Sequence, residues 1–154
     1  MGDSADQRTM TEPVRVFTPA GANALVPALE AIFRRIDPKI AREREIEDLL
    51  DDLESYWGRE MRNAPSGDAE AHARLADERA SIRVSIDTDL REILDNGVEV
   101  KDVRLGLVDF HARIGGDLAY LCWQRGESQV AHWHSLEGGF AARKALDPKA
   151  RAEP

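Results

Sequence analysis

The 154-residue chain has little of what marks several large classes of protein. It contains a single cysteine, Cys122, so no disulfide can form within the chain, which suits a reducing compartment such as the cytoplasm. No apolar run approaches the roughly 20 residues of a membrane-spanning helix, and the first 13 residues lack the apolar core of a signal peptide. With 29 Asp and Glu against 21 Lys and Arg, the chain also lacks the basic excess of a general nucleic-acid binder. We therefore expect a cytoplasmic protein with neither nucleic acid nor a membrane as its partner.

The acidity is unevenly placed along the chain. Residues 1–97 hold 21 acidic and 13 basic side chains, whereas residues 98–154 hold eight of each. The run of acids over residues 43–54 is interpreted as the solvated face of an amphipathic helix, because it lacks the Glu-x-x-His pairs of a di-iron bundle.

Apolar residues at steps of three and four predict two long helices. Thr18 before Pro19 is typical of a capped helix start, and the first stripe runs on to Trp57. Pro38 lies inside this stripe and is expected to kink or break the helix. A polar turn over residues 58–67 leads to a second helix over residues 68–96. The two helices are therefore predicted to form an antiparallel hairpin.

The last third of the chain alternates with a period of two, which is typical of strands. Gly115 and Gly116 separate two such stretches, residues 105–113 and 117–124, and predict a β-hairpin. Counting outward from the glycines pairs Asp109 with Cys122 and His111 with Tyr120 on one polar face. The other face is apolar and holds Val108, Phe110, Ala119, Leu121 and Trp123.

A third strand is predicted over residues 129–135, and its register decides the site. If Trp133 lies on the apolar face, then His132 and His134 join Cys122 on the polar face. This requires an odd-numbered loop around Gly126, which we favour, because an even loop would exchange the two faces.

These elements predict an α+β fold in which a long antiparallel helical hairpin precedes a three- to four-stranded antiparallel sheet. Residues 14–97 are expected to hold a short strand, over residues 14–17, and the hairpin. Residues 98–146 are expected to form a β module packed on the helices. Residues 1–13 and 147–154 are expected to be disordered tails.

The favoured register gathers a set of side chains that suits zinc or a similar divalent metal. The predicted metal ligands are His134, Cys122, His132, His111 and Asp109. Glu127, in the adjoining loop, is a candidate for an outer hydrogen-bonding group or a base. The other interpretation stays open, since no ligand pair has a hallmark spacing. Cys122 is then a buried small hydrophobe, and the histidines bond the backbone or cover the aromatic residues Tyr120, Trp123 and Trp133. The candidates for contact with a small ligand or for a polar network are Asp109, Glu127, Tyr120, Trp123 and Trp133.

Several short motifs together resemble one family. They are Gly106-Leu-Val-Asp-Phe110, Leu121-Cys-Trp123, Gly126-Glu127, Trp133-His134 and Gly139-Phe140, with the opening segment Phe17-Thr-Pro-Ala-Gly-Ala-Asn-Ala-Leu-Val-Pro27. Over about residues 14–146 the chain is similar to the bacterial and archaeal domain-of-unknown-function 2203 family. The resemblance implies a small prokaryotic protein with a helical region and a compact C-terminal module, and it implies no established activity.

The resemblance also bears on the candidate ligands. In the family pattern the position of His111 is often proline and that of His132 often another aromatic residue, whereas Asp109, Cys122, Glu127 and His134 match. A five-ligand metal site is therefore not implied for the family. A smaller site of Asp109, Cys122 and His134 remains, and so does a polar network of Asp109, Glu127 and His134 that orders the sheet.

Two functions follow as hypotheses. The first is a self-associating interaction module, in which a coiled-coil-like stripe on the helical hairpin forms a homodimer. The alternative is a protein that binds a metal or a small ligand on the polar face of the sheet, with hydrolysis as one outcome. The residues alone do not decide whether the chain is an enzyme.

Overall fold

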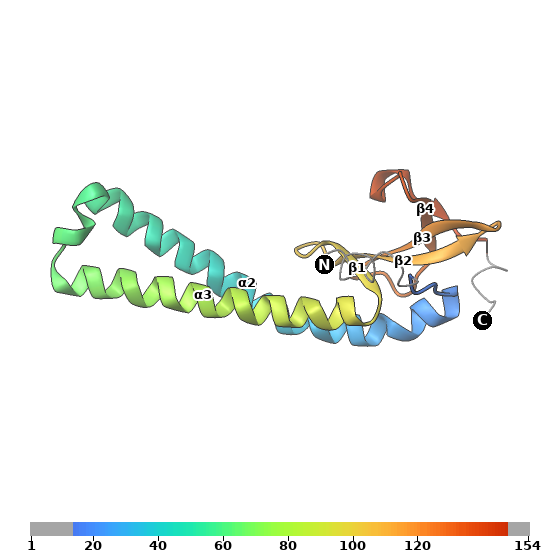
Figure 1. Cartoon of the computed structure of the whole chain (residues 1–154), viewed down its shortest axis with the longest axis horizontal. Coiled ribbons are helices and arrows are strands. Elements are labelled where there is room, and N and C mark those ends of the chain that lie inside the picture. The colour runs from blue at the N-terminus through green and yellow to red at the C-terminus, as the bar shows by residue number, and fades with distance from the viewer. Residues whose placement is uncertain (1–13, 148–154) are drawn as a thin grey trace, which may run out of the picture. The chain divides into compact units, whose positions relative to one another are not determined.

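The computed structural model describes residues 14–147 and has the predicted α+β architecture. Two long helices precede a sheet that is a simple antiparallel meander with neighbours in chain order (Figure 1). The sheet has five strands rather than the predicted three or four, because β1 and the two-residue β5 extend its two edges. The elements are α2 (Pro19–Trp57), η1 (Gly58–Asn63), α3 (Ser66–Asp95), β1 (Val98–Asp102), β2 (Leu107–Ile114), β3 (Asp117–Gln124), β4 (His132–Ser135), η2 (Phe140–Ala142) and β5 (Lys144–Ala145).

The chain divides into two compact units. The sheet unit comprises the chain up to Leu29 together with the chain from Ile93 onward, and the helical unit is Glu30–Glu92. The division falls inside both long helices, so the first turns of α2 and the last turn of α3 belong with the sheet. The predicted disordered tails lie outside the described residues, apart from Asp147.

The start of α2 is capped as predicted, whereas a break at Pro38 and the predicted strand over residues 14–17 are absent. The Thr18 hydroxyl accepts a hydrogen bond from the Gly21 N–H at 3.0 Å. Pro38 does not break α2, since it lies on an exposed face where water can reach the carbonyl that loses its helical partner. Residues 14–17 form no strand. Both sides of β2 are already paired, and Phe17 makes one backbone bond to the carbonyl of His111, just past the end of β1.

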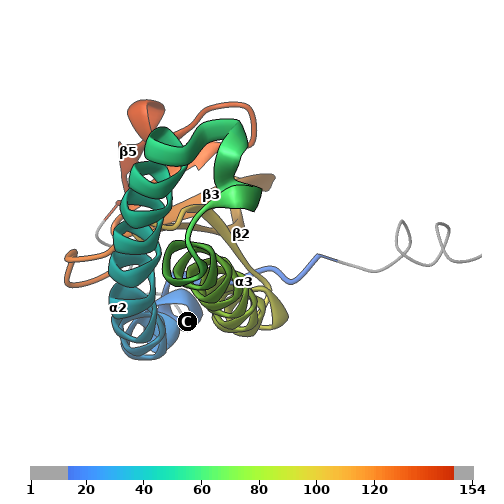
Figure 2. The same cartoon turned by 90° about the vertical axis from the view of Figure 1, so that its left-hand side faces the viewer.

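Within the helical unit, α2 and α3 lie side by side and are joined by ion pairs (Figure 2). Arg42 donates to Glu78 at 2.6 and 2.9 Å, and Arg83 donates to Glu43 at 2.8 Å. Near the connecting turn, the Trp57 indole N–H donates to Asp68 at 2.8 Å. Charged side chains thus flank a narrow apolar seam, as the amphipathic pattern predicts.

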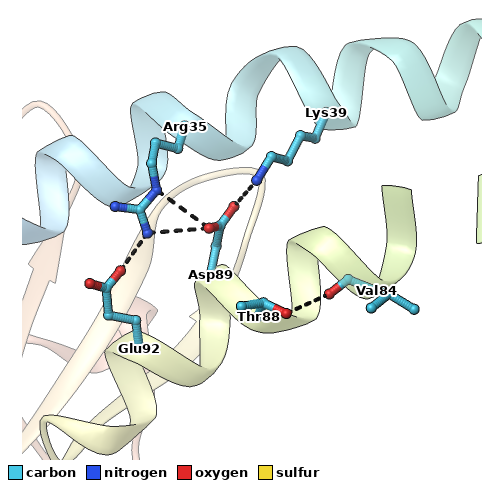
Figure 3. Close-up of polar contacts among 6 residues, drawn as sticks. All are labelled: Arg35, Lys39, Val84, Thr88, Asp89 and Glu92. Atoms are coloured by element: carbon cyan, nitrogen blue, oxygen red, sulfur yellow. Dashed lines mark hydrogen bonds and ion pairs between the residues drawn. The ribbon is translucent and has the colours of Figure 1, made fainter. Parts of the chain in front are cut away.

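The buried carboxylate of Asp89, on α3, forms ion pairs across this seam with two basic side chains of α2 (Figure 3). Lys39 Nζ lies 2.5 Å from one carboxylate oxygen, and Arg35 Nη2 lies 3.2 Å from the other and also pairs with Glu92. Burial by itself would raise the pKa of Asp89, but the hydrogen bonds and charges of Lys39 and Arg35 together lower it below its usual value. The carboxylate is therefore ionised and stabilises the folded form at neutral pH.

Replacing Asp89 with Asn should destabilise the protein by about 1–3 kcal/mol at pH 7, because Lys39 then loses its buried partner. The pKa of Asp89 is lower in the folded state than in the unfolded state, where it is about 3.9. The stability that the ionised carboxylate contributes is therefore fully present above about pH 3.9 and is lost as the pH falls through the folded-state pKa. Urea unfolding at pH 7 and at pH 3 measures the difference. The exposed Asp87→Asn variant is the control, and an equal cost at both pH values would contradict this account.

The sheet has the predicted register. Gly115 and Gly116, with φ of 60° and 89°, form the turn, and Asp109 pairs with Cys122 as His111 pairs with Tyr120. On β4, His132 pairs with Cys122 and His134 pairs with Tyr120, so both histidines lie on the polar face. β4 begins at His132 rather than residue 129. The Val130 N–H donates to the side chain of Asn23 at 2.6 Å instead of pairing with β3.

Candidate metal centre

Three of the predicted ligands come together on adjacent strands. Asp109 lies on β2, Cys122 on β3 and His134 on β4, and one donor atom from each lies within 4.8 Å of the other two. All three residues are buried, with exposed fractions of 2%, 1% and 3%. Asp109 and Cys122 are direct cross-strand partners, which lie about 5 Å apart. His134 is diagonal to Cys122, because its own partner on β3 is Tyr120, so the register gives a shared face and the side chain of His134 completes the cluster.

The ring of His134 is held at both nitrogens. Nδ1 lies 2.7 Å from the carbonyl oxygen of Ser135, which can only accept, so Nδ1 carries a hydrogen and donates. Nε2 lies 3.0 Å from Oδ2 of Asp109. A backbone carbonyl that fixes one imidazole nitrogen leaves the other to share a proton with a carboxylate or to bind a metal.

The second oxygen of Asp109, Oδ1, is buried and accepts no hydrogen bond from an N–H or O–H group. A buried carboxylate oxygen without a partner is costly and is rare in folded proteins. Beside it, burial and then the charge of Asp109 raise the pKa of Cys122 to about 12, although Arg143 acts to lower it. The thiol therefore carries its proton at neutral pH unless a metal displaces it.

A second polar group adjoins the centre and includes a residue that the sequence did not indicate. Arg143 donates to the two carboxylate oxygens of Glu127 at 3.0 and 2.8 Å, and the Gln124 N–H donates to Glu127 at 2.7 Å. Burial raises the pKa of Glu127, but these hydrogen bonds lower it overall, so the carboxylate is ionised. His132 Nδ1 lies 3.7 Å from Glu127, which places His132 with this pair and not among the three clustered ligands.

His111 and Tyr120 share the polar face but lie outside the three-ligand cluster. The ring of Tyr120 lies between those of His111 and His134, with centroid distances of 4.6 and 5.3 Å. Burial, with the hydrogen bond and charge of Glu99, raises the pKa of Tyr120 to about 12, so its hydroxyl stays protonated. His111 Nε2 points to Glu99 at 3.8 Å.

The two tryptophans considered as site residues lie on the opposite face. Trp123 pairs with Val108 and is fully buried in the core, with its indole N–H donating to the carbonyl of Glu127 at 3.0 Å. Trp133 pairs with Leu121, and the Lys144 ammonium lies 5.2 Å from the Trp133 ring centroid. Trp123 thus supports the loop that carries Glu127 without reaching the polar face.

A pocket of about 190 Å³ opens onto the centre from the polar face. Asp109 and His134 line it, whereas Cys122 does not, so a group held by the three donors would be reached from the side of the carboxylate and the imidazole. The lining residues are Lys101, Leu107, Asp109, Tyr120, His134, Leu136, Gly138, Gly139 and Phe140.

The fold and this centre define an α+β protein with a buried carboxylate, thiol and imidazole on a five-stranded antiparallel meander. The chain belongs to the family described as uncharacterized conserved protein (DUF2203), which matches residues 15–146. This confirms the resemblance carried by the sequence motifs. No curated protein and no solved structure matches the chain. Among the described residues, neither long helix is apolar enough to cross a membrane.

Proposed function

We propose that this protein binds one divalent transition metal of the zinc class through Asp109, Cys122 and His134. The observation that carries the proposal is that a buried carboxylate, thiol and imidazole each offer a donor atom within 4.8 Å of the other two, while Oδ1 of Asp109 accepts no hydrogen bond from an N–H or O–H group. A polar network of Asp109 and His134 accounts for Oδ2 alone, whereas a bound cation also gives the cluster's negative charge a partner.

The donor set fits zinc. Thiolate, imidazole and carboxylate are its usual protein ligands, and three of them leave a fourth position for water or a small ligand. The hydrogen bond from His134 Nδ1 to the Ser135 carbonyl is the kind of outer contact that orients a metal-binding imidazole. The pocket lies on the side where the fourth position is expected.

Elemental analysis of protein purified without a histidine tag tests the proposal. We expect close to one zinc, or one metal of similar preference, per chain, and a melting temperature that falls when a chelator removes it. A metal content near zero after incubation with zinc, together with melting that a chelator leaves unchanged, would reject the proposal.

We also propose self-association through the helical unit, on a separate observation. From residue 51 to residue 85 no side chain is buried, although this stretch includes Leu53, Trp57, Leu75 and Ile82 of the predicted apolar stripe. Two helices alone cannot enclose such a stripe, and a second copy of the hairpin would complete a four-helix arrangement. Leu49 is an exposed apolar side chain on α2, one helical turn before Leu53 of this stripe.

If the stripe is covered by a second copy, the wild type should sediment as a dimer at micromolar concentration. Introducing Leu49→Glu should shift it to monomer, because a charge is then buried in each half of the interface. Leu105→Glu, an exposed apolar position in the sheet unit, is the matched control. A wild-type protein that is monomeric at micromolar concentration would contradict the proposed self-association.

A further inference from the structure

The pocket beside the candidate metal centre has a chemistry of its own. It is lined by the two buried polar residues Asp109 and His134 and by the aromatic residue Tyr120. Leu107, Leu136 and Phe140 line it as apolar residues. A volume of about 190 Å³ is below the range of drug-sized ligand pockets, so a compact molecule of a few heavy atoms is the appropriate size.

Lys101 is the one cationic side chain that lines this pocket in the described part of the chain. Its ammonium lies 4.9 Å from the centroid of the Tyr120 ring, which draws the cation over the pocket wall. The Lys101 ammonium lies 3.8 Å from a carboxylate oxygen of Glu99, which is longer than a hydrogen bond, and Glu99 does not line the pocket.

Charge indicates the kind of ligand. A divalent cation held by the Asp109 carboxylate, the Cys122 thiolate and a neutral imidazole forms a centre of zero net charge, so Lys101 then carries the only net charge among the residues that line the pocket. Without the metal, the negative charge of Asp109 offsets the positive charge of Lys101. Anion binding in the pocket should therefore depend on the metal.

We infer that the metal-loaded site takes a small monocarboxylate with a short alkyl chain, an inference that rests on the proposed metal site. One carboxylate oxygen occupies the fourth position at the metal, the other accepts a hydrogen bond from Lys101, and the alkyl chain contacts Leu107, Leu136 and Phe140. A single lysine matches one carboxylate, whereas a phosphate usually calls for several donors. The apolar wall distinguishes an alkyl carboxylate from a bare inorganic anion.

Titration of the cobalt(II)-loaded protein with acetate, propionate and butyrate tests the inference. The visible absorption of cobalt reports a change of its ligands, and the thiolate-to-cobalt band reports that the metal is in place. We expect each added methylene to tighten binding by about four-fold. We expect Lys101→Gln to weaken butyrate binding by about ten-fold while leaving cobalt binding unchanged. Lys144→Gln, which changes a lysine outside the pocket, is the matched control.

The outcomes separate the two proposals. If cobalt binds with its thiolate band but butyrate leaves the spectrum unchanged, the ligand inference is wrong and the metal site stands. Equal affinities for the three acids, or equal affinities in the wild type and the Lys101→Gln variant, would overturn it as well. If cobalt gives no thiolate band, the metal site itself is rejected.

Discussion

Replacing His134 with Ala should reduce zinc binding by more than about 100-fold. Even the outer partners of metal ligands contribute 10- to 100-fold, and His134 provides the imidazole donor that the Ser135 carbonyl orients. Cys122→Ser should have a similar effect, because a serine hydroxyl does not ionise at neutral pH and is a poor zinc ligand. Competition against a chromophoric chelator measures both affinities.

His111→Ala is the matched control for this loss. His111 lies on the same face of the sheet and is also partly buried, but it is not among the three clustered ligands. It should bind zinc as the wild type does. Zinc affinity that is unchanged in His134→Ala, or lost equally in His111→Ala, would contradict the assignment of the ligands.

Truncating Trp123 to Ala should cost about 3–5 kcal/mol of unfolding free energy. The side chain is fully buried on the apolar face, and its indole N–H donates to the Glu127 carbonyl at 3.0 Å. The variant therefore loses the packed ring and leaves the partly buried Glu127 carbonyl without its donor. Total stabilities are about 5–15 kcal/mol, so this loss is a large fraction of the total.

Urea unfolding followed by circular dichroism measures this cost. Trp123→Phe should recover a large part of the loss, since it restores an aromatic ring without the N–H donor. Tyr56→Ala removes an aromatic residue that is 79% exposed and should change stability by less than about 0.5 kcal/mol. A Trp123→Ala cost as small as that of Tyr56→Ala would refute the placement of Trp123 in the core.

Much of the sheet could be predicted because its register follows from counting. The pair Gly115-Gly116 fixes the pairing of Asp109 with Cys122, and alternation then assigns every later side chain to a face. Counting does not decide whether the loop before β4 has an odd or an even number of residues, and this number determines which face His134 occupies. The structure confirms the odd loop, which brings His134 to the same face as Cys122.

Other features could not be derived from local pattern. Arg143 meets Glu127 across 16 residues, in a segment whose sequence resembles a loop, so no periodic signal marks the contact. The unbroken path of α2 through Pro38 reflects the packing of a helix stripe, which outweighs one lost hydrogen bond. The register places all five predicted ligands on one face of the sheet. Only the side-chain geometry of the structure shows that three of them cluster and that His111 and His132 do not.

X-ray absorption at the zinc edge of the loaded wild-type protein is the most direct test of the central proposal. The account predicts one sulfur neighbour at about 2.3 Å and the remaining nitrogen and oxygen neighbours at about 2.0–2.2 Å, with the sulfur absent in Cys122→Ser. A spectrum of zinc surrounded by nitrogen and oxygen alone in the wild type would contradict it.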